Sequence, residues 1–519
     1  MTETLFSRVQ ANLDMLNHAI VDQIRSLVSS GTLETEQVKA YQLSQSAAAL
    51  LAIPTMIEYA AHGEHERDVA ALYCVQTLRD TAASLLQAGL LDPLVSQSIF
   101  SSDLQIDTGV VQRVALDPGP AHLSTDLELA ADAFRRVAED KIAPYADEIH
   151  RHNLDIPEAI IDQLAQMGAF GLSIPEQFGG SSTESAEDLI AMLIATEELS
   201  RASLGAGGSL ITRPEILSKA LLAGGTQEQK QRYLPALASG ELMGAVAVTE
   251  PDFGSDVAHI TTTATPTADG WRISGTKTWC TFAGRAEILA VLARTDPDRN
   301  LGHRGLSLFF VDKPRFQGES FRYEANGGVI EGRAIATLGY RGMHSYEVSL
   351  DNVLVPENQL IGESGGLGRG FYLQMAGFEN GRIQTAARAI GVMQAAYEAA
   401  RTYAEGRLVF GQSLIDYQLT RAKLARIAAT IQAGRQLTYA VARLLAHHQG
   451  SLEASMTKAY TCRAAEWVTR EAMQLHGGMG YAEEYPVSRY FVDARVLSIF
   501  EGAEETLALK VIARGLARR

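Results

Sequence analysis

Cysteine is scarce in this 519-residue chain, which has only Cys74, Cys280 and Cys462, far apart in the sequence. Three scattered thiols match neither a disulfide framework nor a zinc-binding pattern, so we expect buried free thiols and no metal site. No apolar run approaches the ~20 residues of a membrane helix. The start is acidic from Glu3 and lacks the basic-then-apolar pattern of a signal peptide. We therefore expect a cytoplasmic protein without a membrane span.

Positive charge is also in short supply. The chain has 45 Lys and Arg against 61 Asp and Glu, a formal net charge of −16. This balance argues against nucleic acid or an anionic membrane surface as the main partner. It does not exclude an anionic ligand, because binding depends on local charge. The length suits about three domains of ~150 residues each.

The arrangement of apolar residues changes along the chain. Apolar residues recur at helical spacing in the first 106 residues, which predicts helices over 4–30, 34–62 and 65–90. A Pro/Gly-rich stretch at 116–126 indicates a linker. A second helical region then extends to about residue 243.

Short runs of β-type residues broken by turn residues follow, and they indicate an antiparallel sheet or barrel over about 244–354. The runs are "GAVAVTE", "GWRISGTKTW", "EILAVLART", "GLSLFFVDK" and "HSYEVSLDNVLV". Long helices of a bundle are predicted after it, over 368–406, 413–448, 451–476 and 503–517. The predicted domains are a helical N-terminal extension (1–118), a helical domain (119–243), a β-sheet or barrel domain (244–357) and a C-terminal helical bundle (358–519).

Two segments of the sheet region carry residues suited to a planar ligand. In "AVTEPDFGSD" (247–256), Thr249, Ser255 and backbone N–H groups at a glycine turn can face a polar ring and its phosphates. In "SGTKTWCTFAGRAE" (274–287), Trp279 and Thr281 lie two apart, so on a strand both point to one face. An ordinary inter-strand turn and a core tryptophan with a bonded threonine explain the same residues.

Near the C-terminus, "RVLSIFEGAEETLALKVIARGL" (495–516) places a lone carboxylate at the end of an apolar run. Val496, Leu497, Ile499 and Phe500 precede Glu501, and a helical pattern begins after Gly502. A Glu beside a helix N-terminus is commonly a helix cap. A carboxylate held by a turn and partly desolvated by apolar neighbours is instead suited to general base catalysis.

Three further segments of the last region are informative only together. They are "GFENGRIQTAARAIG" with Arg382, "AEGRLVFGQSL" with Arg407 and Phe410, and "MQLHGGMGYAEEYPVSRYFVDARVLSIFEGAEE" with Gln474, Gly477 and Gly478. Alone, each has an ordinary reading as a solvated arginine or a C-capping glycine.

In this order and at these separations, the segments resemble the acyl-CoA dehydrogenase family. The resemblance covers about 125–519 and rests on "VTEPDFGSD", "GTKTWCT", "EGRLVFGQSL", "QLHGGMGY" and "DARVLSIFEGAEE". It implies a mixed α and β fold: an N-terminal helical domain, a middle antiparallel β domain and a C-terminal four-helix bundle. The helical extension precedes these domains. One FAD per subunit is also implied.

The resemblance also implies roles for single residues. Glu501 matches the base that removes the α-proton while hydride passes from the β-carbon to flavin N5; the position that carries the base in some members is Gly381 here. The implied FAD contacts are Thr249, Ser255, Trp279 and Thr281, with Arg407, Phe410, Gln474, Gly477 and Gly478 reaching the FAD of a second subunit. The implied substrate contacts are Ser255, Arg382 and Gly502.

Within the family, the extra segment of about 118 residues resembles the members that convert (2S)-methylsuccinyl-CoA to mesaconyl-CoA in the ethylmalonyl-CoA pathway. A buried substrate carboxylate needs a cation or several donors, and Arg213 is the first candidate and His344 the second. The alternative interpretation of Arg213 is a surface or helix-capping residue.

Other functions remain open at this point. They are a dehydrogenase for a neutral short branched acyl-CoA of the isobutyryl or butyryl type, an oxidase that uses O₂, and a flavin-free helical interaction scaffold. The implied partners are an acyl-CoA substrate, an electron-transfer flavoprotein and further copies of the chain, with a homodimer favoured and a tetramer possible. We expect the extension to pack on the C-terminal bundle.

Overall fold

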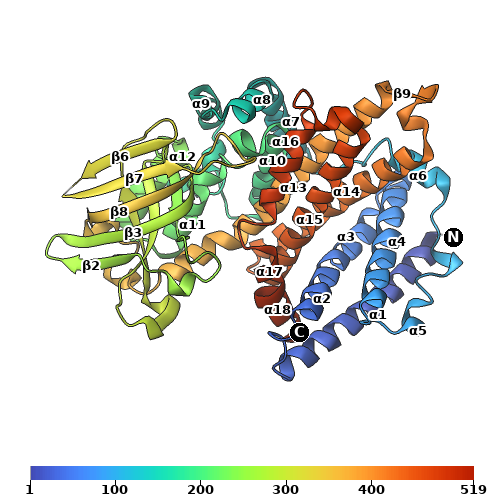
Figure 1. Ribbon diagram of the computed structural model, residues 1–519, viewed down its shortest axis with the longest axis horizontal. Helices are drawn as coiled ribbons and strands as arrows, with labels where there is room; N and C mark the ends of the chain where they lie inside the picture. The colour runs from blue at the N-terminus through green and yellow to red at the C-terminus, as the bar shows by residue number, and fades with distance from the viewer. Residues whose placement is uncertain (1, 326) are drawn as a thin grey trace. The chain divides into compact units, whose positions relative to one another are not determined.

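The computed structural model describes residues 2–325 and 327–519, which form two compact units (Figure 1). One unit combines the N-terminal part up to Glu128 with Arg382–Arg519, and the other is Leu129–Gly381. Within the described residues, no helix is long and apolar enough to cross a membrane.

The first unit is helical. Its N-terminal helices are α1 (Thr2–Ser29), α2 (Gln37–Leu50), α3 (Ala52–Tyr59), α4 (Glu64–Gln87), α5 (Pro93–Ser96) and α6 (Thr108–Val114). In α1, a stripe with three- and four-residue spacing is buried: Val9, Leu13, Leu16, Ile20 and Ile24. Such a stripe needs a surface to pack against, and tertiary packing rather than propensity then holds the helix.

The C-terminal part of this unit supplies that surface. Its helices are α13 (Gly370–Gly406, most of which lies here), α14 (Gln418–Ala446), α15 (Ser451–Leu475), α16 (Val487–Leu497), α17 (Glu504–Thr506), η12 (Leu507–Ile512) and α18 (Ala513–Ala517). Helices α3, α4 and α6 contact α14, α2 contacts α15 and η12, and α1 contacts α18 (Figure 1). The extension therefore packs on the bundle of its own chain, as expected.

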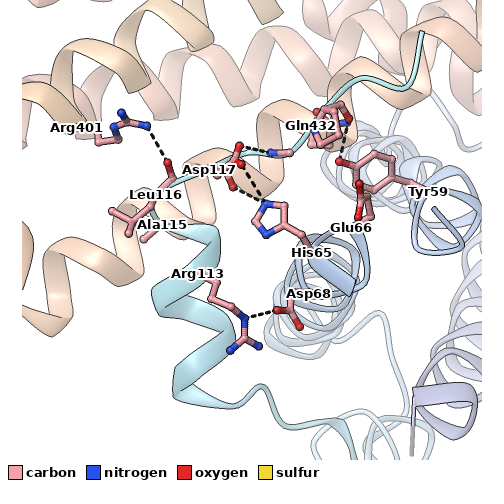
Figure 2. A network of polar contacts seen from close by, with 12 residues as sticks. Tyr59, His65, Glu66, Asp68, Arg113, Ala115, Leu116, Asp117, Arg401 and Gln432 are labelled. Atoms are coloured by element: carbon pink, nitrogen blue, oxygen red, sulfur yellow. Dashed lines mark hydrogen bonds and ion pairs between the residues drawn. The ribbon is translucent and has the colours of Figure 1, made fainter. Parts of the chain in front are cut away.

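The predicted linker is bound to this bundle along its backbone (Figure 2). Arg401 of α13 donates to the carbonyl of Leu116 at 2.8 Å. Gln432 of α14 and Tyr59 of α3 both donate to the carbonyl of Pro120, at 2.9 and 3.0 Å. Because backbone carbonyls left unpaired in such contacts cost free energy, these bonds hold the linker in one course.

The second unit contains a helical layer and a sheet. Its helices are α7 (Thr125–Val137, which begins before the division), α8 (Ala143–His152), α9 (Glu158–Gln166), α10 (Ala186–Ala202), α11 (Thr212–Gly224) and α12 (Gln227–Ser239). Capping boxes begin two of them: Ser185 bonds the N–H of Asp188 at α10, and Thr226 bonds that of Gln229 at α12.

The strands are β1 (Gly244–Ala247), β2 (Thr263–Thr267), β3 (Gly270–Thr281), β4 (Ile288–Arg294), β5 (Leu306–Asp312), β6 (Ser320–Ala325), β7 (Gly328–Ala334) and β8 (Ser345–Val355). They form one sheet of order β1-β4-β2-β3-β8-β7-β6, with β5 also paired to β4. Pairing is mainly antiparallel, as expected, but β1 and β2 run parallel to β4. Residues of α11 and α12, among them Leu217, Tyr233 and Leu237, pack against β4 and β5.

The fold class predicted from the sequence is confirmed: helical regions flank a middle β domain in the chain, and a helical extension precedes them. Strands β2, β6 and β7 and helix α16 were not among the elements predicted. A two-residue hairpin formed by β9 (Leu408–Val409) and β10 (Gln412–Ser413) completes the elements used below.

Candidate functional site

Glu501 lies in a turn between α16 and α17. Its φ of +53° and that of Gly502, +99°, are both left-handed, which is uncommon for a residue with a side chain. One carboxylate oxygen, Oε2, is buried and has no hydrogen-bond partner among the described residues. Buried polar atoms are almost always hydrogen-bonded, so an exception needs an explanation. A group of a bound ligand that bonds this oxygen would supply one.

The apolar run before Glu501 does not bury it as a block. Leu497 is buried, but Ile499 is 54% exposed, because helix α16 ends at Leu497 and the next residues follow the turn. Phe500 is half-buried, with the guanidinium of Arg388 5.6 Å from its ring centroid. The expectation that Ile499 desolvates the carboxylate was therefore wrong.

Lys458 of α15 supports this turn and was missed by the sequence analysis. Its buried Nζ donates to the carbonyl of Gly502 at 2.7 Å. Burial lowers the pKa of Lys458, and the nearby carboxylates of Glu501 and Glu504 oppose that shift. A lone lysine within the small-residue run "ASMTKAYT" was the signal available.

Arg382 reaches the same stretch of α15 from α13. Its Nη1 donates to Ser455 Oγ at 3.1 Å, three residues before Lys458 and so on the same face of the helix. The structure thus brings Arg382, Gly502 and Glu501 around one segment of α15.

On the sheet, the two predicted ligand segments lie side by side. The N–H of Thr278 in β3 donates to the carbonyl of Thr249 at 2.8 Å. Next to this bond, the buried Nζ of Lys277 lies 2.9 Å from Glu250 Oε1. Burial alone would raise the pKa of Glu250, but Lys277 and hydrogen bonds from neighbouring threonines lower it to about 2.

Trp279 and Thr281 differ from a regular strand pair. Pairing with β8 is irregular between Lys277 and Cys280, and Trp279 has a φ of +57°. Strand alternation alone therefore does not set the direction of its ring. Trp279 is 56% exposed, and Thr281 Oγ1 lies 3.0 Å from Ser345 Oγ. Ser255 is also exposed, so an aromatic face and a serine on these segments are accessible to a planar ligand.

In the other unit, Phe410 is at the tip of the β9–β10 hairpin. Phe410 and Gly411 have φ values of +49° and +89°, the signs of a primed two-residue turn. Phe410 is 97% exposed and Arg407 is exposed too. A fully exposed phenylalanine held in a tight turn is available to a partner or ligand.

An aromatic cluster connects this hairpin to the end of α15. The ring of Tyr403, in the last turn of α13, stacks on His476 at 4.3 Å, and Tyr485 packs edge-on against both. Burial lowers the pKa of His476, so its ring is neutral near pH 7. The predicted contacts at and just after the end of α15 are exposed: Gln474, Gly477 and Gly478.

The two candidates for a substrate carboxylate lie in the second unit. Arg213, at the start of α11, is buried, and its described donors reach the carbonyl of Ser209 and the hydroxyl of Thr212, both at 3.3 Å. His344 is buried with its Nε2 3.2 Å from Asp155 Oδ1. His344 therefore already has an anionic neighbour.

These features fit a flavin and its substrate. Trp279 and Phe410 offer exposed aromatic surfaces. Among the described residues, a side chain added at Gly477 or Gly478 would meet nothing within 4 Å, and one buried oxygen of Glu501 has no hydrogen-bond partner. Glycines without neighbouring atoms leave room for a ligand close to the backbone.

Comparisons with known proteins agree. Family models for the N-terminal, middle and C-terminal domains of acyl-CoA dehydrogenases match residues 124–241, 245–353 and 368–517. A (2S)-methylsuccinyl-CoA dehydrogenase of Cereibacter sphaeroides is 45% identical over 401 residues, 77% of this chain and 71% of that protein.

Two solved structures have the same fold. Butyryl-CoA dehydrogenase from Megasphaera elsdenii has a TM-score of 0.70 at 29% identity, over 77% of this chain and 99% of that chain. A glutaryl-CoA dehydrogenase from Mycobacterium smegmatis in complex with FADH2 has a TM-score of 0.66 at 25% identity, over 76% and 96%. The chain therefore belongs to the acyl-CoA dehydrogenase family and is an FAD-dependent oxidoreductase acting on a CH–CH bond of an acyl-CoA.

Proposed function

We propose that the chain dehydrogenates (2S)-methylsuccinyl-CoA to mesaconyl-CoA, with Glu501 as the base. The observation that carries the chemistry is the buried Glu501 Oε2, which has no partner among the described residues. The 45% identity to a (2S)-methylsuccinyl-CoA dehydrogenase supports the substrate.

The chain's own part in the reaction is to place and deprotonate the thioester. An α-proton next to a thioester is weakly acidic, so its removal needs a positioned carboxylate and donors at the carbonyl oxygen. Glu501 accepts the proton, and the N–H of Glu501 bonds the carbonyl. FAD, when bound, supplies the two-electron acceptor. Arg382 and Gly502 line the acyl end of the substrate site.

Thr249, Ser255, Trp279 and Thr281 would hold the flavin of their own subunit. The backbone bond between Thr249 and Thr278 supports this set, because it brings the two segments together.

Arg407, Phe410, Gln474, Gly477 and Gly478 would contact the FAD of a second subunit. The 97% exposure of Phe410 supports that assignment, which requires at least two subunits. We propose a homodimer, because the extension covers the bundle of its own chain. Light scattering should then give about twice the 56.0 kDa subunit mass. A monomer or a tetramer would contradict the homodimer.

Arg213 is our candidate for the distal carboxylate of the substrate. It is a buried cation, and its described donors reach only uncharged oxygens, so an added carboxylate would be a stronger partner. His344 is second, because Asp155 already lies beside its ring.

A panel of acyl-CoA esters tests the substrate. Each ester is mixed anaerobically with the yellow holoenzyme, and flavin bleaching is followed. The expected order is methylsuccinyl-CoA well ahead of isobutyryl-CoA and butyryl-CoA, because a site built for a carboxylate is left with unpaired groups by a neutral analogue. A preference for butyryl-CoA would contradict the proposed substrate. Fast reoxidation by an electron-transfer flavoprotein and slow reoxidation by O₂ would support a dehydrogenase over an oxidase.

A further inference from the structure

The turn that carries Glu501 needs external support. A residue with a side chain in the left-handed region costs on the order of 1–3 kcal/mol and persists only where its surroundings impose that conformation. Lys458 provides one restraint, at the carbonyl of Gly502. A second restraint acts two residues further on, at Glu504.

Glu504 receives side-chain donors from two parts of the chain. Tyr41 Oη and Gln45 Nε2, both on α2 of the extension, donate to its Oε1, the latter at 3.2 Å. Nε of Arg463 in α15 lies 3.3 Å from the same oxygen, Glu504 Oε1. The N–H of Glu504 donates back across the turn to Ser498 at 3.1 Å. The carboxylate therefore connects the extension directly to the residues that close the turn.

The hydroxyl of Tyr41 is protonated at neutral pH, as a hydrogen-bond donor to Glu504 must be. Burial and the hydrogen bond to Glu504 raise the pKa of Tyr41 to about 12, so its hydroxyl is a donor at neutral pH. The Glu504 side chain is only 15% exposed, which makes loss of a donor costly.

The same face of the extension stays attached beyond Glu504. Ser44 Oγ donates to the carbonyl of Ala508 at 3.0 Å in η12. Glu34 pairs with Lys510 and Arg514 at 2.6 and 3.0 Å. The contact thus continues along the segment that follows the turn.

We propose that Tyr41 and Gln45 are positioning residues for the dehydrogenation: by holding Glu504 they keep the turn of Glu501 in its reactive conformation. The extension then takes part in catalysis as well as covering the bundle. This inference rests on the proposed role of Glu501 as the base.

The test uses the full-length holoenzyme with Tyr41→Phe and Gln45→Leu combined, and Tyr41→Phe alone as a milder variant. Misplacing a catalytic group by about 1 Å can cost on the order of 10²-fold in rate. We expect anaerobic flavin bleaching at saturating methylsuccinyl-CoA to slow about 10- to 100-fold in the double variant. FAD content and acyl-CoA affinity should stay within about twofold of wild type, a split that general destabilisation would not produce.

Gln42→Leu is the matched control. Gln42 precedes Gln45 by three residues on α2 but bonds Ser84 within the extension, at 2.8 and 2.9 Å. Its bleaching rate should equal that of wild type. A folded double variant that bleaches at the wild-type rate overturns the inference, and so does an equal loss in Gln42→Leu. If the double variant does not fold, an unchanged bleaching rate in Tyr41→Phe overturns it, and a slowed rate supports it.

Glu501→Gln separates this inference from the proposed function. If Glu501→Gln still bleaches, the base assignment fails and takes the inference with it. If Glu501→Gln is inactive while the Tyr41 and Gln45 variants are normal, only the inference fails.

Discussion

Two carboxylates of this chain that have buried oxygen atoms have opposite surroundings. Glu250, which follows strand β1, is 3% exposed. Its carboxylate accepts hydrogen bonds from Lys277 Nζ, from the backbone N–H of Thr261, from the backbone N–H of Thr262 and from the Thr261 hydroxyl. Glu501, in its turn, keeps a buried oxygen with no partner among the described residues.

This difference indicates that Glu250 has a structural role and that Glu501 has a catalytic one. A buried carboxylate with all its bonds made stabilises the segment that holds it, whereas an unbonded buried oxygen costs free energy that folding alone does not recover. Glu250 and Lys277 are thus expected to hold Thr249 and Trp279 in place. Glu501 is expected to receive its partner from the substrate.

The largest effect is predicted for Glu501→Gln. The amide cannot accept the α-proton, so flavin bleaching should slow by about 10³-fold or more. FAD content and acyl-CoA binding should be retained, because the side chain keeps its shape. Stopped-flow absorbance with methylsuccinyl-CoA measures the rate. Activity within tenfold of wild type would contradict the base assignment.

Lys277→Met should instead damage the fold. Removing one partner leaves Glu250 as an uncompensated buried charge, which costs roughly 3 kcal/mol or more of unfolding free energy. Denaturant unfolding measures the loss. Arg322→Met, which breaks an exposed pair with Glu331 in the same sheet, is the control and should leave the midpoint unchanged. Equal behaviour of the two variants would remove the structural role given to the buried pair.

Arg213→Met tests whether this buried cation, whose described partners are uncharged, binds the distal carboxylate of the substrate. We expect kcat/KM for methylsuccinyl-CoA to fall about 10²-fold, since the variant cannot pair the distal carboxylate. Turnover of butyryl-CoA should fall much less, because that ester has no second carboxylate. A similar loss on both esters would assign Arg213 to the fold.

The smallest predicted effect is a pH dependence due to Glu250. Its pKa is lowered from 4.5 to about 2 on folding, so its stabilisation is fully present above pH 4.5 and declines as the pH falls toward 2. Between pH 4.5 and 3 this group alone should remove about 2 kcal/mol of unfolding free energy. Denaturant titrations should show that Glu250→Gln loses less unfolding free energy than wild type between about pH 4.5 and 3, by this amount. Parallel pH curves would refute the assignment.

Much of the helical architecture could be predicted because it depends on local spacing. The stripe from Val9 to Ile24 specifies a buried helix face wherever it packs. The continuous apolar strands β4 and β5 were equally clear. Strand β2 was not, because "TATPT" has one buried residue and a proline, and β6 and β7 carry charges between their apolar residues.

The candidate site was predictable only as separate segments. In the sequence, Thr249 precedes Glu250 and Trp279 is two residues after Lys277. A strand pattern does not reveal the irregular pairing at which Trp279 has a positive φ. Side-chain alternation holds only where the pairing is regular. The exposure of Ile499 was missed for a similar reason: hydrophobicity does not reveal that α16 ends two residues earlier.

By itself, the sequence determined most helices, the main strands and the glycine turn after Glu501, all of which depend on residues near one another in the chain. It also determined the family pattern, which depends on the order and separation of short motifs. Only the tertiary structure brought His476 onto Tyr403, Lys458 to Gly502 and Tyr41 to Glu504. The physical reason is that local propensity specifies the conformation of a segment. The partner of a buried donor is selected by packing among segments that are far apart in the chain.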